Sequence, residues 1–295
     1  MRIAHIIPCR NKAAVVAATV AAALDQTYPS HIILSDQGST DGSLEILRSM
    51  AMRYRGPHKV TVFSCPETEP VGMRGMNAHL DWLMANTDEP YVMITSADDI
   101  PYPERTAKVA EAFEAHKPDM VLTKIHFVYP DGLIYGHTAN PEVEGFVDPT
   151  LCINGLVGGS TSHAMTREFY EAVGGFEGIC GFDAYWPFLA TVRNGAWFIN
   201  EPLHAYVSYA DVQNTGLEGI SRAADEDGKL AVEELMHFQV QTSYIKAALT
   251  MQAWGIENQK ATDTLLQAIL DRATGWTAAR EKMTLKRIAP LSLKA

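Results

Sequence analysis

The feature that most constrains the fold of this chain is the regular alternation of strand-like and helix-like segments over its first 125 residues. Short β-branched runs are each followed by a turn and a stretch with helical spacing of apolar side chains. Strands are expected at residues 2–7, 31–35, 59–63, 91–95 and 119–125. Helices are expected at 12–25 and 72–84, in the stretch that follows the turn at 36–42, and in the stretch that ends at about residue 116. This alternation predicts an α/β fold with a mostly parallel sheet flanked by helices.

The pattern changes beyond residue 125. Residues 129–181 are rich in Gly, Pro, Asn and Thr and have weak strand patterns, which is typical of irregular substrate-facing segments on a rigid sheet. After Gly228 the chain is helical again, at about 229–254 and 257–283, and we expect these helices to pack on the core or to form an oligomer contact. No internal repeat divides the chain. We therefore predict one α/β domain at residues 1–225, with halves at 1–125 and 126–225, and a helical C-terminal extension at 226–295.

The composition excludes several classes of protein. An apolar fraction of 47% in 295 residues supplies an ample core, so general disorder is excluded. The net charge of -11 disfavours a general nucleic-acid binder, because a phosphate backbone is repelled unless basic residues cluster. The four cysteines share no C-x-x-C or Cys/His spacing, which argues against a disulfide framework and a structural zinc site. A cytoplasmic location is expected.

Two terminal segments resemble targeting or docking signals. Residues 13–24 form an apolar run like that of a signal peptide, but twelve residues are too short to span a bilayer, and a strand and Pro8 precede them. No transmembrane segment is expected. Residues 280–295 carry five Lys or Arg against Glu281, a local charge of +4. We interpret this tail as a basic helix end that complements the helix dipole, with peripheral docking to an anionic membrane or nucleic acid as the alternative.

Polar side chains follow three of the predicted strands at their carboxyl ends, where open parallel sheets bind ligands. Carboxylates with small neighbours at such an edge suit Mg²⁺ or Mn²⁺, which share their oxygen ligands with phosphate groups. The pattern therefore predicts a site for a metal-bound nucleotide. The residues are Pro8, Arg10 and Asn11 after the first strand, Asp36 at the second, and Asp98 and Asp99 after the fourth.

A structural role competes with this interpretation at each carboxylate. Asp36 and Asp41 flank glycines in a turn, and Asp residues there are ordinary turn and N-cap formers. We interpret Asp41 as a cap and leave both roles open for Asp36. A functional role is favoured for Asp98 and Asp99, because adjacent carboxylates repel each other and capping needs only one. No glycine-rich phosphate loop accompanies them.

Several separated motifs occur in the order seen in one known family. They are IIPCRN at residues 6–11, QTYP at 26–29, SDQGSTDGSLEIL at 35–47, Asn77, YVMITSADD at 91–99, GGF at 174–176 and GFD at 181–183. Together they resemble family 2 glycosyltransferases with the GT-A fold, over residues 3–209. The resemblance implies a GT-A-like, Rossmann-type sheet in which residues 1–125 bind the nucleotide-sugar and residues 126–225 form the acceptor side.

The resemblance also implies an activity and roles for individual residues. An inverting hexosyltransferase would move a hexose from a nucleotide-sugar, UDP-linked in our expectation, to an acceptor hydroxyl, with Asp183 as general base. Asp36 would accept a hydrogen bond from the nucleotide base, and Asp98 and Asp99 would hold Mn²⁺ or Mg²⁺. The other implied contacts to the donor are Pro8, Arg10, Asn11, Arg74 and Asn77, with Asp98 also at the ribose, while His163 and Trp186 would lie on the acceptor side.

This sequence departs from the family pattern at several positions. Gln37 stands where many members have a second aspartate, Ser96 where the first carboxylate of Asp-x-Asp lies, and Phe182 where a glutamate precedes the base. Tyr209 replaces a common histidine, for which Asp211 or His204 are candidate substitutes. These departures leave the metal site with fewer charges. A degenerate nucleotide-sugar-binding module is therefore an alternative function.

A nucleotidyltransferase is a second alternative, but residues 8–12 lack the glycine-rich basic loop that such enzymes carry near the first strand. The sequence does not select the acceptor. A saccharide, a lipid-linked glycan, a protein side chain and a hydroxylated nucleic-acid base all present hydroxyl groups.

Overall fold

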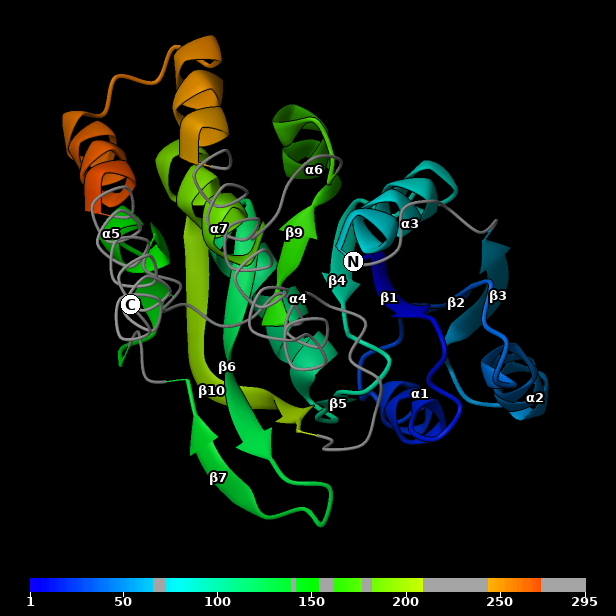
Figure 1. Ribbon diagram of the computed structural model, residues 1–295. Helices are drawn as coiled ribbons and strands as arrows, with labels where there is room; N and C mark the ends of the chain where they lie inside the picture. Colours follow the sequence, from blue (N-terminus) through cyan, green and yellow to red (C-terminus); the bar gives the residue numbers. More distant parts are fainter. Residues whose placement is uncertain (66–72, 139–141, 154–161, 177–181, 209–243, 272–295) are drawn as a thin grey trace, which may run out of the picture.

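The computed structural model describes residues 1–65, 73–138, 142–153, 162–176, 182–208 and 244–271 (Figure 1). Among these residues a ten-stranded sheet has the order β3-β2-β1-β4-β9-β6-β10-β5, with β7 paired to β6 and β8 to β10. The elements are β1 (Ile3–Cys9), α1 (Val16–Leu24), β2 (His31–Gln37), α2 (Ser43–Arg53), β3 (Lys59–Cys65), α3 (Met73–Ala85), β4 (Tyr91–Ile94), β5 (Ile100–Pro101), α4 (Arg105–His116), β6 (Met120–Val128), β7 (Ile134–His137), β8 (Gly145–Phe146), α5 (Pro149–Ile153), β9 (Ala164–Thr166), α6 (Arg167–Val173), α7 (Phe182–Arg193) and β10 (Ala196–Val207).

The first four long strands form the parallel half of the sheet that the alternation predicts. β1 pairs in parallel with β2 and with β4, and β2 pairs in parallel with β3. The register places Cys9 opposite Asp36, and Gln37 opposite Cys65, so the carboxyl ends of these strands are level. The polar residues that follow the strands therefore share one edge of the sheet, which we call the carboxyl edge.

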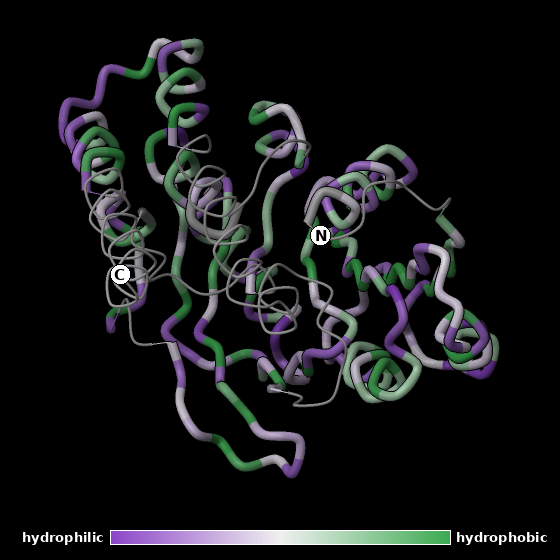
Figure 2. The backbone as a smooth tube through the Cα atoms, in the orientation of Figure 1, coloured by the Kyte–Doolittle hydropathy of each residue, from purple (hydrophilic) through white to green (hydrophobic). Residues whose placement is uncertain are grey.

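Both faces of this half are buried, because successive side chains of a strand point to opposite faces. Ile7, Ile32 and Leu34 pack with apolar residues of α1 and α2. Their neighbours Ile6 and Ile33 pack on the other face with residues of α3. Figure 2 shows apolar colouring along the central strands and alternating colours along the covering helices. Continuous apolar runs such as residues 32–34 are thus explained by burial on two sides.

The second half is more regular than its composition indicated, and it includes strands of opposite direction. The three-residue strand β9 lies between β4 and β6 and is antiparallel to both. β6 continues past the predicted end at residue 125 to Val128 and turns into β7, and it also pairs in parallel with the twelve-residue β10. Elements as short as β9 carry too few residues for a periodicity to be recognised. The sheet is accordingly mixed but mostly parallel.

The described part of the C-terminal extension is helical at residues 244–253 and 259–271, as expected. Tyr244, Met251 and Leu265 are buried in the cluster that also contains core residues of α3 and α7. The guanidinium of Arg193 lies 5.9 Å from the ring centroid of Trp254, and Lys260 Nζ is 2.5 Å from Asp148 Oδ2. These helices therefore pack back on the core. The basic tail at 280–295 lies outside the described residues.

In the part of the chain that the structure describes, no helix has both the length and the apolar composition needed to cross a membrane. Cys9, Cys65 and Cys152 are buried free thiols, and Cys180 lies outside the described residues. Burial is the main reason that the pKa of the Cys9 thiol is raised to about 12.

Candidate active site

The turns that follow β1 and β2 are bound to each other at the carboxyl edge. Asn11 has a left-handed φ of 51°, and its backbone N–H donates to Ser39 Oγ at 2.8 Å. In return the N–H of Thr40 donates to Asn11 Oδ1 at 2.9 Å. Asp41, predicted to be a cap, accepts hydrogen bonds from Ser43 and from the N–H of Ala13, while the N-cap position of α2 is Gly42. Asn11 thus shapes this edge through its backbone conformation and its amide.

Asp36 combines burial with an unused hydrogen-bond acceptor. Its Oδ2 accepts the N–H of Ser39 at 2.9 Å, and the residue is 1% exposed. Its Oδ1 has no hydrogen-bond partner among the described residues. An unpaired buried polar atom costs on the order of 1–3 kcal/mol, so such atoms need an explanation. A ligand that donates a hydrogen bond at the end of β2 would supply one.

Asp98 lies in the turn after β4, where it forms an ion pair with Lys12 of the β1–α1 turn. Lys12 Nζ is 2.6 Å from Asp98 Oδ2, and the side chains are 14% and 27% exposed. The backbone N–H of Lys12 donates to Ser43 Oγ at 2.8 Å. Because α1 begins at Val16 and not at the predicted residue 12, Lys12 belongs to this turn and not to the helix. The ion pair therefore joins the turns after β1 and β4, and the backbone of Lys12 ties them to Ser43 at the start of α2.

The structure places Asp99, one of the two expected metal ligands, in the interior. Asp99 is 1% exposed, and its Oδ1 accepts the N–H of Val207 at 3.4 Å. The fully buried Arg105 interacts electrostatically with it and donates to Thr95 Oγ1 at 2.6 Å. Burial lowers the pKa of Arg105 to about 9, and the charge of Asp99 opposes that shift. Repulsion between the adjacent carboxylates is relieved because each has its own cation.

Among the described residues, the side chains at this edge make a poor ligand set for a divalent metal. Of Asp98 and Asp99, Asp98 is the carboxylate that is partly exposed, and Lys12 already binds its Oδ2. Within the described ranges no group of three potential ligand side chains is close enough to hold an ion. His204 is fully buried, and burial lowers its pKa well below the usual value. Asp211 and Tyr209 lie outside the described residues.

Helix α3 connects the end of β2 to the turn that contains the GGF motif. Gln37 Nε2 donates to the carbonyl of Gly75 at 2.9 Å, and Ser35 Oγ lies 2.7 Å from His79 Nε2. The Asn77 amide, which was expected to face the nucleotide, is buried and donates to the carbonyl of Phe176 at 2.9 Å. The side chain of Arg74, in the first turn of α3, lies outside the description.

The GGF turn is held by Asp81, a residue that the sequence did not single out. Asp81 Oδ1 accepts the backbone N–H of Phe176 and the hydroxyl of Tyr170, each at 2.7 Å. Gly175 has a φ of 83°, and a Cβ there would lie 2.9 Å from Asp81 Oδ1. Glycine is therefore required at this position by conformation and by space. No local sequence signal relates Asp81 to a partner 95 positions away.

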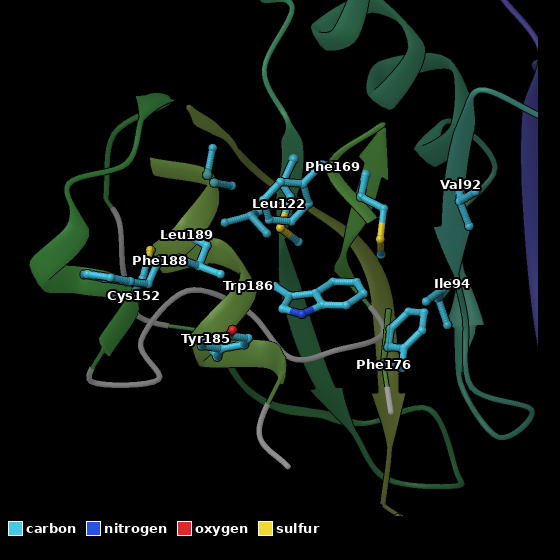
Figure 3. Packing of buried hydrophobic residues seen from close by; sticks show 14 of the residues in the cluster. Val92, Ile94, Leu122, Cys152, Phe169, Phe176, Tyr185, Trp186, Phe188 and Leu189 are labelled. Carbon is cyan, nitrogen blue, oxygen red and sulfur yellow. The ribbon is translucent and has the colours of Figure 1, made fainter. Parts of the chain in front are cut away.

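The proposed base and one of the two proposed acceptor-side residues lie on α7, and the other, His163, directly precedes β9. Asp183 is the second residue of α7, and its side chain lies outside the description. Trp186, expected to stack on an acceptor, is fully buried, with its ring centroid 4.3 Å from that of Phe176 and 6.0 Å from that of Phe169 (Figure 3). His163 is also fully buried. The structure assigns Trp186 to the core because this face of α7 packs on the sheet.

The remaining predicted residues flank the carboxyl edge. Pro8 is half-buried within β1, paired with Ser35, and Arg10 is half-buried directly after the strand. The structure thus brings Pro8, Arg10, Asn11, Asp36 and Asp98 to one edge. A cavity of about 410 Å³ lies elsewhere, against the amino ends of β4 and β6, lined by residues such as Tyr91 and Asp119. This cavity lies at the opposite edge of the sheet from Pro8, Arg10, Asn11, Asp36 and Asp98.

Known structures share this architecture. The S. aureus TarS fragment 1–349 superposes with a TM-score of 0.62 at 14% identity, covering 95% of this chain and 73% of that one. Its complex with UDP-GlcNAc gives a TM-score of 0.54 at 12% identity, covering 92% and 80%. The mannosyltransferase PcManGT from Pyrobaculum calidifontis, in complex with GDP-Man and Mn²⁺, gives 0.51 at 17% identity, covering 94% and 80%. At these identities the likeness shows a shared fold.

Among curated protein sequences, none is significantly similar to this chain. The sequence profile of glycosyl transferase family 2 matches residues 5–174, which is more than half of the chain; the match includes most of β1, Asp36 and Asp98 and ends at Gly174, the first residue of the GGF motif. The chain therefore belongs to glycosyl transferase family 2.

Proposed function

We propose that this glycosyltransferase moves a hexose from a UDP-linked donor to an acceptor hydroxyl with inversion at the anomeric carbon. The observation that carries the donor site is the unpartnered, buried Oδ1 of Asp36 at the carboxyl edge. A uracil ring presents an N–H that this oxygen would accept. The complex of TarS with UDP-GlcNAc supports a nucleotide-sugar as the ligand of this fold.

The sugar transfer would need a base on the acceptor side. In our proposal Asp183 removes the proton of the acceptor hydroxyl while the acceptor oxygen attacks the anomeric carbon from the face opposite the leaving diphosphate. In-line attack inverts the configuration at that carbon. The position of Asp183 at the start of α7, seven residues after the Phe176 turn that α3 holds, supports this role.

The test of Asp183 measures release of UDP or GDP from a panel of UDP-glucose, UDP-GlcNAc and GDP-mannose, with water as the acceptor. A positioned general base contributes ~100-fold to 10,000-fold to the rate, so Asp183→Asn should lower turnover by about that factor and leave UDP affinity nearly unchanged. Asp88→Asn, which changes a carboxylate in an exposed pair with Arg2, is the matched control and should retain full activity.

Two results would contradict the proposal. Equal turnover of wild type and Asp183→Asn would remove Asp183 as the base. Tight binding of UDP-sugars without any release of nucleotide, even with acceptor mixtures of saccharides, lipid-linked glycans and proteins, would favour the degenerate binding module instead.

A further inference from the structure

The ion pair between Lys12 and Asp98 occupies the place where the sequence pattern led us to expect a metal. Asp98 is the carboxylate at this edge that reaches solvent, while Asp99 is turned inward toward Val207 and Arg105. Ser96, two residues earlier, carries no carboxylate. The described side chains here therefore hold one partly exposed ammonium group beside a single partly exposed carboxylate, and no group of three potential metal ligands is found among the described residues.

Lys12 is fixed at both its backbone and its side chain. Its carbonyl accepts the N–H groups of Val15 and Val16 at 2.9 and 2.8 Å, and its own N–H donates to Ser43 Oγ. Nζ lies 2.6 Å from Asp98 Oδ2, with the side chain 14% exposed. A lysine ammonium has three N–H donors, and Asp98 accepts one of them. A group held in this way is preorganised to bind a second anion from the solvent side of the edge.

The same hydrogen-bond network links Lys12 to the carboxylate proposed to contact the base. Lys12 follows Asn11, whose N–H binds Ser39 Oγ, and the N–H of Ser39 binds Asp36 Oδ2. The ammonium and the unpartnered Oδ1 of Asp36 are thus carried by turns that are bonded together at one edge. A nucleoside diphosphate, with a base at one end and negative charge at the other, matches this arrangement.

We propose that Lys12, held in place by Asp98, binds the diphosphate of the donor and stabilises its departure, so that sugar transfer by this chain requires no divalent metal. This inference rests on the proposed glycosyltransferase function and assigns the residue that takes up the charge of the leaving group. Asp98 acts as a positioning residue, since it holds the ammonium and does not itself contact phosphate.

The transfer step balances without a further reagent. The bond between the anomeric carbon and the β-phosphate oxygen breaks, and its electron pair stays on that oxygen, beside the Lys12 ammonium. A lone pair of the acceptor oxygen forms the new bond to the anomeric carbon. The acceptor proton passes to the Asp183 carboxylate, and Lys12 keeps all of its protons throughout.

The first experiment compares uridine and UDP as calorimetric titrants of the full chain in EDTA. Uridine has no phosphate, so Lys12→Met should weaken UDP binding by ~10-fold to 100-fold and leave uridine affinity within about twofold. Lys12→Arg keeps the charge and should restore most of the UDP affinity. Lys108→Met, which removes a lysine from an exposed pair with Glu201, is the matched control and should change neither titration.

The second experiment measures hydrolysis of UDP-glucose and UDP-GlcNAc in EDTA and in Mn²⁺. Wild type should turn over equally in both solutions, and Lys12→Met should lose ~100-fold of its turnover in both, as expected for loss of one preorganised charge-stabilising donor. Thermal unfolding of each variant shows whether it is folded at the assay temperature.

Three outcomes overturn the inference. The first is equal UDP affinity in wild type and Lys12→Met, and the second is wild-type hydrolysis that EDTA abolishes and Mn²⁺ restores. The first two outcomes leave the proposed function standing, because the nucleotide is still bound in the first and the nucleotide-sugar is still hydrolysed in the second. In the third, wild type binds neither uridine nor UDP and consumes no nucleotide-sugar, and the proposed function fails together with the inference.

Discussion

At the scale of single residues, the candidate site depends on how four aspartates are paired. Asp41 accepts hydrogen bonds from Ser43 and from the N–H of Ala13, Asp98 binds Lys12, and Asp99 is buried beside Arg105. Asp36 Oδ1 is buried and has no hydrogen-bond partner among the described residues. Sequence patterns identify all four as polar residues at strand ends, but the partners come from distant parts of the chain. The pairing decides which aspartate is left for a ligand.

Asp36→Asn tests the residue that we assign to the nucleotide base. The amide oxygen can still accept the N–H of Ser39, so the turn should persist, but the NH₂ group would then face the ligand and oppose the N–H of uracil. Since a hydrogen bond to a charged group contributes ~1.5–3 kcal/mol, affinity for both uridine and UDP should fall by about 10-fold to 100-fold. Calorimetric titration measures this fall. Unchanged uridine affinity would exclude Asp36 from base binding.

At the scale of elements, α3 is the helix that joins the two halves of the proposed site. One of its sides is bonded to Ser35 and Gln37 of β2, and its residues Asn77 and Asp81 hold Phe176. Phe176 in turn packs against Trp186 of α7 (Figure 3). Helix α7, which carries the proposed base Asp183 as its second residue, is therefore positioned by a series of contacts that begins beside the donor site.

Asp81 should accordingly position the start of α7 without touching a substrate. Asp81→Ala removes the acceptor for both Phe176 N–H and Tyr170 hydroxyl, and we expect turnover to fall at least ~10-fold with little change in UDP affinity, as a misplaced catalytic group would cause. Asp81→Asn retains an acceptor oxygen and should recover most of the activity. Steady-state kinetics of UDP-sugar hydrolysis, run well below the unfolding temperature, check both variants.

A pair of glycine variants provides the structural control for Asp81. Gly174 and Gly175 both have positive φ, but only the Cβ of Gly175→Ala would crowd Asp81 Oδ1. Gly175→Ala should therefore lower turnover more than Gly174→Ala does. Equal effects of the two glycine variants, or full activity of Asp81→Ala, would contradict the assignment.

At the scale of the whole molecule, sequence reasoning succeeded where structure is local and failed where partners are remote. The strands and helices up to residue 125 were predictable because buried β-branched runs and helical periodicity are read within a few residues. The three-residue β9 and the twelve-residue β10 depend on pairing with distant strands, so no local pattern identified them. For the same reason the sequence does not reveal that Asn77 and Trp186 both contact Phe176.

The whole fold also buries several histidines, which makes its stability depend on pH. Burial lowers the pKa of His79 to about 4 and that of His5 and His204 well below the usual 6.5. Between these values and 6.5 the unfolded chain binds protons that the folded chain does not. Stability therefore falls as the pH drops below about 6.5 and is retained above it.

His79 alone should account for about 2 kcal/mol of this loss between pH 7.5 and pH 5, because in the unfolded chain it takes up a proton over the roughly 1.5 pH units below 6.5, at about 1.36 kcal/mol per unit, while its folded-state pKa is about 4. Urea unfolding of wild type at the two pH values measures the total loss. His79→Gln, which keeps a partner for Ser35, should show a loss smaller by about that amount. The same pH dependence in the variant and in wild type would contradict the assignment.

A crystal structure of the full chain grown with UDP-glucose and EDTA would show whether the carboxyl edge of this sheet binds a nucleoside diphosphate-sugar. We expect the uracil N–H within hydrogen-bond distance of Asp36 Oδ1 and the diphosphate beside Lys12. Density for the nucleotide at any other place on the molecule, or with its base remote from Asp36, would contradict it.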